Sequence, residues 1–201
     1  PPELYARAEA ELRSVLPSLR LASMERTEIW ALASSLALLE YQVKYPTVPP
    51  LDLVLFQRGQ VLGKETGGLE TAQEQLDAMN AFTPAEQVAM LRAMLDDADA
   101  LRKRGEDPVR RLLEAYQQGD TAAIDREVNR SFEGCPPALR QRFETLLLAE
   151  RNRKMAERIA SRMRETPGKG TFFVVGALHG LGKGSVVELL GAAGVRAVRV
   201  E

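Results

Sequence analysis

The residue best suited to chemistry is His179, the single histidine of the chain. It follows the apolar run 172–175 and lies in a loop that holds four glycines between residues 176 and 184. The run predicts a buried strand, and Ser185-x-x-Glu188 has the spacing of a capping box at a helix start. Open α/β sheets bind ligands at the carboxyl ends of their strands. His179 is therefore either a functional imidazole at such an edge or a loop histidine that only bonds its neighbours.

Glu70 lies at a second junction of this kind. The stretch 65–70 has strand character, and Thr71-x-x-Glu74 is another capping box that predicts a helix start. A carboxylate at this place is either a favourable partner of the helix dipole or an inward-facing ligand or base. The sequence leaves both interpretations open.

Arg151 interrupts an apolar stripe in the helix predicted over about 137–165, where its neighbours at i−4 and i+4 are Leu147 and Met155. A guanidinium directed into a core needs a partner, because burying the charge alone is costly. Alternatively, a long basic side chain extends into solvent. Asn152 also interrupts the stripe, which favours a buried polar cluster. The other basic residues of this helix are expected to form a solvated face: Arg153, Lys154, Arg158, Arg162 and Arg164.

The composition excludes several classes of function. One histidine and one cysteine, Cys135, rule out a His-Glu-x-x-His protease, a three-histidine site and a cysteine zinc site. The 27 Lys and Arg balance 28 Asp and Glu, which argues against a nucleic-acid partner. The longest apolar run, 29–39, is shorter than the roughly 20 residues of a membrane span. The glycine loop misses the Walker A register, because Ala177 occupies the first glycine position.

The fold expected from these patterns is a helix-rich α/β domain over residues 1–201. Helical periodicity covers most of the chain, and only 65–70, 171–176 and 195–200 have strand character. We therefore expect a small mixed sheet flanked by helices, with a helical insertion at about 82–134. Three scattered strands make a poor sheet, so further strands are expected to precede Pro1. Exposed sheet edges or a homo-oligomer contact would replace the absent strands.

Several short blocks resemble the TraB/PrgY/GumN family, to which the Tiki proteins belong. They occur in the family's order and cover nearly the whole chain: Leu51-Asp52, Gly63-Lys64, Gly68-Leu69-Glu70-Thr71, Glu150-Arg151-Asn152, and Val174 to His179 followed by Gly182, Gly184 and Gly194. The resemblance implies a fold related to erythromycin-esterase-like and ChaN-like folds. The family's shared polar positions are two Gly-x-x-His motifs, a glutamate and an arginine. The second motif corresponds to Gly176 and His179, the glutamate to Glu70 and the arginine to Arg151.

Tiki proteins act as metal-dependent proteases that use manganese or cobalt. The resemblance therefore implies a metal-dependent hydrolase, a peptidase acting on a peptide or protein. His179 and Glu70 would ligate Mn²⁺ or Co²⁺, or Glu70 would act as the base on a bound water. Arg151 would stabilise oxyanion charge or hold Glu70.

The first Gly-x-x-His of the family has no counterpart, because the chain has no second histidine. The sequence thus resembles the C-terminal two-thirds or so of such a domain, and an upstream histidine is expected to complete the site. The alternative function is a non-catalytic module of the TraB/PrgY type that binds and sequesters a peptide. Bacterial members of the family lead us to expect a cell-envelope or extracytoplasmic location, with a cytoplasmic one left open.

Overall fold

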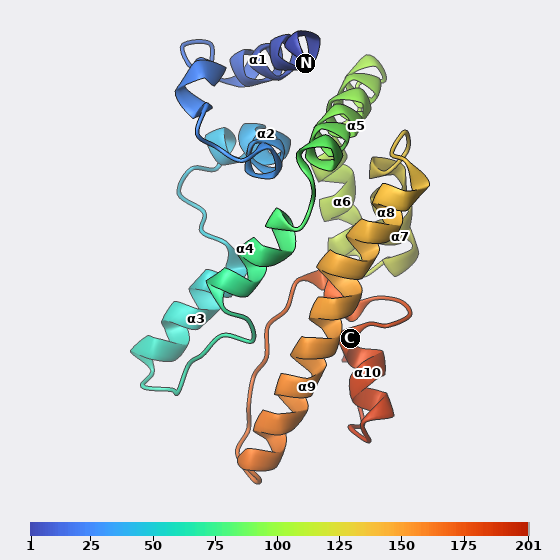
Figure 1. Ribbon diagram of the computed structural model, residues 1–201. Coiled ribbons are helices and arrows are strands. Elements are labelled where there is room, and N and C mark those ends of the chain that lie inside the picture. The colour runs from blue at the N-terminus through green and yellow to red at the C-terminus, as the bar shows by residue number, and fades with distance from the viewer. Residues whose placement is uncertain (201) are drawn as a thin grey trace. The chain divides into compact units, whose positions relative to one another are not determined.

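The computed structural model describes the backbone of residues 1–200 and their side chains except that of Pro108. Within this range the regular elements are helical (Figure 1). The α-helices are α1 (Pro2–Val15), α2 (Ile29–Lys44), α3 (Leu51–Val61), α4 (Ala72–Asn80), α5 (Pro84–Lys103), α6 (Pro108–Gln117), α7 (Thr121–Ser131), α8 (Pro137–Phe143), α9 (Glu150–Glu165) and α10 (Val186–Ala192). The 3₁₀ segments η1 (Leu21–Met24) and η3 (Ala177–Gly180) and the π-helical segment η2 (Glu144–Ala149) complete them. None of these helices is long and apolar enough to cross a membrane.

The expectation of an α/β fold with a small mixed sheet is wrong. No strand occurs among residues 1–200, and the stretches 65–70, 171–176 and 195–200 are irregular. The segment 171–176 runs beside α9 as an open chain (Figure 1). Phe173 and Val175 pack against the core, whereas Phe172 on the opposite side is 77% exposed. The segment thus keeps the two-residue alternation of a strand, but a strand also needs a hydrogen-bonded neighbour, and the described chain provides none.

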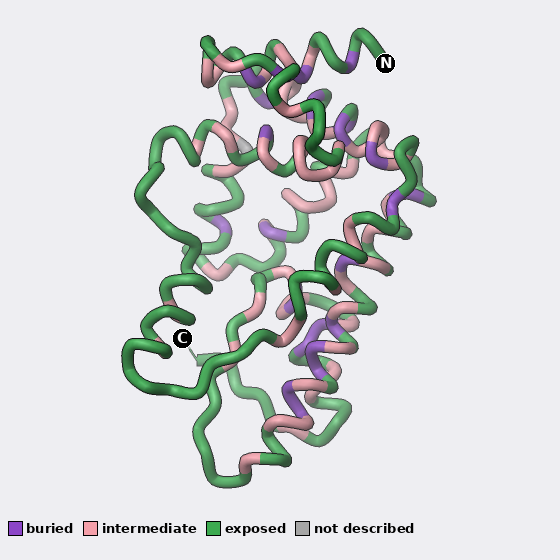
Figure 2. Tube along the Cα trace, turned by 60° about the vertical axis from the view of Figure 1, so that its left-hand side comes forward, coloured by how far each residue is buried: buried purple, intermediate pink, exposed green. Residues whose placement is uncertain are grey.

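The chain divides into two compact units, and most of its buried residues lie on helices (Figure 2). Unit 1 comprises Pro1–Val48 and Phe82–Arg140. Its core follows from the four-residue spacing of Leu4, Ala8 and Leu12, which places the three side chains on one face of α1. They pack with leucines of η1, α2 and α5: Leu21, Leu36, Leu91 and Leu95.

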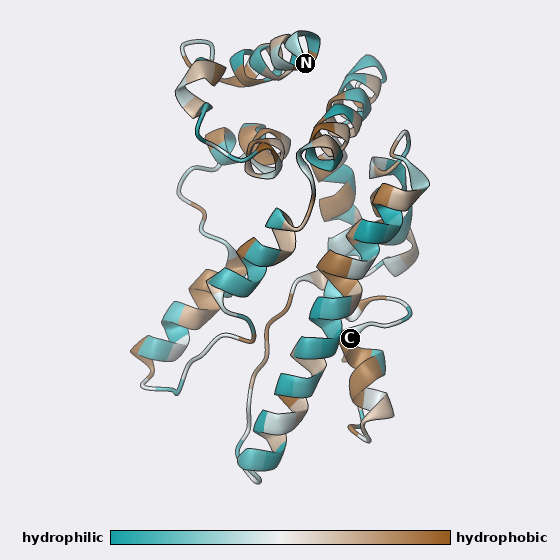
Figure 3. Cartoon of the chain, viewed as in Figure 1, coloured by the Kyte–Doolittle hydropathy of each residue, from teal (hydrophilic) through white to brown (hydrophobic). Residues whose placement is uncertain are grey.

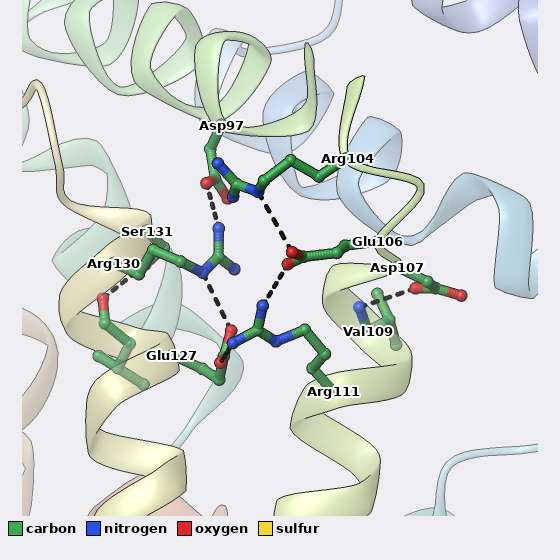
Figure 4. A network of polar contacts seen from close by, with 10 residues as sticks. Asp97, Arg104, Glu106, Asp107, Val109, Arg111, Glu127, Arg130 and Ser131 are labelled. Atoms are coloured by element: carbon green, nitrogen blue, oxygen red, sulfur yellow. Dashed lines mark hydrogen bonds and ion pairs between the residues drawn. The ribbon is translucent and has the colours of Figure 1, made fainter. Parts of the chain in front are cut away.

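Charged side chains connect α5, α6 and α7 within unit 1 (Figure 4). Arg130 contacts both Asp97 and Glu127. Arg111 lies 2.7 Å from Glu127 and also contacts Glu106. Burial raises the pKa of Asp97, while the positive charge of Arg130 opposes that shift. Each partly buried charge of this network therefore has an oppositely charged partner, which offsets the cost of removing the charge from water.

Unit 2 comprises Pro49–Ala81 and the chain from Gln141 onward. The segment η2 runs directly into α9, which is mainly hydrophilic, whereas the adjacent α10 is mainly hydrophobic (Figure 3). One side of α9 forms the core through Met155, Ala156 and Ile159, which pack with Val186 of α10. Leucines and other partly buried apolar residues join this core: Leu69, Phe173, Val175, Leu189 and Leu190. The three segments that carry Glu70, Arg151 and His179 are thus attached to one apolar cluster.

The expectation of a single domain over 1–201 with an insertion at about 82–134 stays a prediction. The segment 82–134 lies within unit 1, together with the first 48 residues.

Candidate functional site

Glu70 is held by a tight loop and a capped helix. A Cβ on Gly68 would lie 2.7 Å from the backbone oxygen of Glu70, so the loop requires glycine at this position. Thr71 then starts α4 with the expected capping box: its Oγ1 accepts the Glu74 N–H at 3.1 Å, and the Glu74 carboxylate accepts the Thr71 N–H at 2.9 Å. This local geometry constrains the backbone on both sides of Glu70.

The carboxylate of Glu70 pairs with the guanidinium of Arg151. Arg151 Nε donates to Glu70 Oε1 at 2.9 Å, and Nη2 donates to Oε2 at 2.7 Å. The Glu70 side chain is only 4% exposed and that of Arg151 is 23% exposed. Arg151 also donates to the Leu147 carbonyl at 3.4 Å. Of the two fates open to Arg151, the structure shows pairing rather than extension into solvent.

His179 lies in η3 and is buried. Its Nδ1 lies 2.6 Å from Oδ1 of Asn152, the residue that follows Arg151. Asn152 is itself buried and donates through Nδ2 to the Gly184 carbonyl at 2.8 Å. The buried polar cluster that the sequence favours is therefore present, with Asn152 as the link between α9 and the glycine loop.

The electrostatics of this cluster favour a neutral imidazole. Burial lowers the pKa of His179 from its ordinary value of 6.5, and the charge of Arg151 lowers it further. The charge of Glu70 acts in the opposite direction. Both charges act on the imidazole, which brings the three residues singled out in the sequence into one electrostatic neighbourhood. Their catalytic and metal-binding roles stay predictions.

Two further arginines of α9 hold the loop of Glu70, contrary to the expectation of a solvated face. Arg158 donates to the Leu69 carbonyl at 2.6 Å and to both oxygens of Glu74 at 2.6 and 2.9 Å. Arg162 donates to the Gly68 carbonyl at 2.6 Å. Positions 151, 158 and 162 lie seven and four residues apart, which places them on one face of a helix. That spacing groups the three arginines, although it does not show which segment they contact.

Arg153 behaves as expected for the solvated face. It pairs with Glu157 at 2.8 Å on the surface of α9, and the two side chains are 58% and 62% exposed.

The bidentate contact with Arg158, together with the Thr71 N–H, lowers the pKa of Glu74 to about 2. Glu74 thus serves both as the capping residue of α4 and as the counter-ion that fastens α4 to α9.

These residues do not by themselves fit a metal ion. In the described part of the chain, no three His, Cys, Asp or Glu side chains are grouped so that they could hold one. Catalytic zinc sites, for comparison, use three protein ligands, and both oxygens of Glu70 already accept hydrogen bonds from Arg151. This chain therefore offers the Nε2 atom of His179 and a carboxylate engaged elsewhere, which is less than a metal centre requires.

The sequence that forms these elements and this polar cluster matches a known protein family. The TraB/PrgY/gumN family model matches residues 1–199, and the chain belongs to this family. Among its curated relatives, Metalloprotease TIKI2 of Danio rerio is 28% identical over 178 residues, covering 81% of this chain and 34% of the relative. Metalloprotease TIKI1 is 26% identical in Danio rerio, over 94% of this chain and 46% of the relative. The human Metalloprotease TIKI1 is 29% identical, over 81% of this chain and 35% of the relative.

The chain thus spans between about a third and under half the length of these relatives. The relatives come from animals, so they give no support to the expectation of a bacterial protein. No solved structure matches the chain.

Proposed function

We propose that this chain forms part of a Tiki-like hydrolase that cleaves peptides, and that Glu70, Arg151 and His179 belong to its active site. The relatives named metalloproteases support the class of reaction. The observation that carries the proposal is the ion pair between the buried Glu70 carboxylate and the partly buried Arg151, whose charges act on the buried imidazole of His179. Burying a charge during folding costs free energy. Ionisable groups in such costly environments cluster at functional sites.

In this proposal the three residues have different tasks. His179 remains neutral and presents a ring nitrogen to a ligand or a proton. Arg151 holds the Glu70 carboxylate in a fixed orientation through two hydrogen bonds. Because both oxygens of the Glu70 carboxylate are engaged in this contact, an electrostatic or positioning task suits Glu70. Of the tasks considered for Arg151, holding Glu70 has the direct support.

A divalent metal is part of the proposal, with Mn²⁺ or Co²⁺ as the ions that the family resemblance implies. Its chemistry would be to activate a water for attack on the peptide carbonyl. Because His179 and Glu70 supply fewer than three ligands, the complete centre needs at least one ligand beyond this cluster.

The rival function is a non-catalytic module that binds and sequesters a peptide. The observation in its favour is that both Glu70 oxygens are already engaged by Arg151, which suits an anchoring pair. Such a module would bind peptide without metal and without cleaving it. The two functions therefore differ in turnover and in metal dependence.

The test is hydrolysis of a fluorogenic peptide library by the longest natural polypeptide that contains this chain, with Mn²⁺ or Co²⁺ supplied. We expect metal-dependent cleavage, and we expect the cleavage rate to fall at least about 100-fold in His179→Ala, as it does when a general acid or base is removed. The matched control is Gln87→Ala, which removes a buried, bridging amide of unit 1 and should leave cleavage intact. Unchanged cleavage in His179→Ala would refute the proposal, and metal-independent peptide binding without cleavage would establish the rival.

A further inference from the structure

In the described part of the chain, Asn152 is the side chain that hydrogen-bonds to the imidazole of His179, and it makes two contacts. Its Oδ1 lies 2.6 Å from His179 Nδ1, and its Nδ2 donates to the Gly184 carbonyl at 2.8 Å. Both Asn152 and His179 are buried, so water competes poorly for these bonds. The pair is therefore held in a defined geometry.

The Gly184 carbonyl fixes which way the amide of Asn152 faces. A carbonyl oxygen can only accept a hydrogen bond, so the amide atom facing it must be the NH₂ group. The reversed amide would bring two oxygens together and leave the partly buried Gly184 carbonyl without its donor, which is costly. Gly184 is itself anchored, since its N–H donates to the Glu188 carboxylate at the start of α10. The oxygen of Asn152 therefore faces the imidazole.

This orientation determines where the imidazole carries its proton. The amide oxygen of Asn152 has no proton to donate, so His179 Nδ1 must be the donor. A neutral imidazole has a single N–H, and a proton on Nδ1 leaves Nε2 with a bare lone pair. An imidazole free in water prefers the opposite tautomer, with its proton on Nε2. The contact with Asn152 thus selects the form that solution disfavours.

We propose that Asn152 is a positioning residue that holds His179 as the Nδ1–H tautomer and leaves the Nε2 lone pair free to accept a proton or a hydrogen bond. The catalytic consequence rests on the proposed function, whereas the tautomer itself does not.

The tautomer can be measured directly, because His179 is the only histidine of the chain. Long-range ¹H–¹⁵N correlation spectra of the ¹⁵N-labelled chain, recorded well above the pKa of imidazole, distinguish a protonated from a bare ring nitrogen. We expect a pyrrole-type signal for Nδ1 and a pyridine-type signal for Nε2. A pyrrole-type signal for Nε2 would overturn the proposal.

Variants at residue 152 test whether Asn152 is the cause. Asn152→Leu removes the acceptor at similar volume and should shift the imidazole toward the Nε2–H form. Asn152→Asp restores an acceptor and should restore the Nδ1–H form. Gln87→Leu removes an equally buried bridging amide in unit 1 and should leave the tautomer unchanged. An unchanged tautomer in a folded Asn152→Leu variant would also overturn the proposal, and if that variant does not fold, the wild-type spectrum decides alone.

Activity separates this inference from the proposed function. In the peptide-hydrolysis assay, Asn152→Leu should lower kcat about 10- to 100-fold, the usual effect of removing the hydrogen-bond partner that orients a functional histidine. If the wild-type spectrum shows the Nδ1–H form but His179→Ala keeps full activity, the tautomer stands and the proposed function fails. If cleavage depends on His179 but Nε2 carries the proton, the proposed function stands and the inference about Asn152 fails.

Discussion

Both oxygens of Glu70 accept hydrogen bonds from Arg151, although 81 positions separate the two residues in the sequence. The contact joins the loop before α4 to the first turn of α9. Leu69, the residue before Glu70, packs against the core cluster of unit 2, so the ion pair lies beside that core. An ion pair in such a position constrains two segments at once, so its removal should affect both stability and function.

Removing the guanidinium should destabilise unit 2. Arg151→Ala leaves the buried charge of Glu70 without compensation, and we expect a loss of about 3 kcal/mol in unfolding free energy. Arg151→Lys should recover only part of it, because an ammonium cannot reproduce two parallel hydrogen bonds. The measurement is urea unfolding followed by the NMR signals of His179, which lies in unit 2.

The matched control for this experiment is Arg153→Ala. Arg153 forms an exposed pair on the same helix, and such pairs contribute at most about 1 kcal/mol. Fluorescence of Trp30, the only tryptophan, reports on unit 1 in the same samples. A loss in Arg151→Ala no larger than that in Arg153→Ala would show that the pair is not buried as described.

Stability in acid should depend on Glu74. Its folded pKa of about 2 lies below the ordinary value of 4.5, so the folded state holds the proton less tightly than the unfolded state. Its contribution to stability is then fully present above pH 4.5 and is lost as the pH falls toward about 2. Glu74→Gln retains a capping-box residue but removes the charge. It should flatten the fall of the melting temperature over this pH range.

The control for the acid experiment is Glu157→Gln, which removes a carboxylate from an exposed ion pair within α9. Its melting temperature should follow the wild-type pH dependence. If Glu74→Gln also follows the wild-type curve, the contact between Glu74 and Arg158 does not hold α4 against α9 in solution.

The apolar face of α9 should differ sharply between two positions one turn apart. Ile159 belongs to the core of unit 2 and is 4% exposed, whereas Met163 is 43% exposed. Ile159→Ala should cost about 2–5 kcal/mol because it leaves a cavity. Met163→Ala should change stability by no more than about 0.5 kcal/mol. Equal losses at the two positions, measured by urea unfolding, would place the core elsewhere.

Helix ends could be predicted from the sequence because the responsible interactions are local. Thr71 caps α4 as expected, and Ser185 caps α10 by accepting the Glu188 N–H at 3.2 Å. The carboxylate of Glu188 turns instead to the Gly184 N–H. Gly63 and Gly194, which follow the ends of α3 and α10, have φ values of 63° and 83°, which other residues adopt with strain.

The sheet could not be predicted because strand formation depends on partners distant in sequence. The apolar run 172–175 predicts a buried strand, but a run of this kind indicates only that an extended chain fits against apolar surface. Phe173 and Val175 find that surface on the core of unit 2, and Phe172 does not. The pattern thus located the packing segment correctly and its hydrogen bonding wrongly.

Ion pairs and hydrogen bonds of arginines with residues distant in sequence could be predicted only in part. The interruption of an apolar stripe was enough to predict a partner for Arg151, since a buried charge demands one. Arg158 and Arg162 interrupt no such stripe, so their contacts with the loop 68–74 follow only from the placement of that loop. Sequence spacing shows that the three arginines share a helix face but not which segment lies opposite.

The most direct test of the Glu70–Arg151 pair is a double-mutant cycle with Glu70→Gln, Arg151→Leu and the double variant, followed by urea unfolding through the His179 signals. The free energies of two residues in contact are not additive. We predict a coupling energy of at least about 1 kcal/mol, within the range known for contacting pairs. If the two single losses of unfolding free energy add up to the loss of the double variant within about 0.5 kcal/mol, as they do for residues far apart, Glu70 and Arg151 do not interact as described.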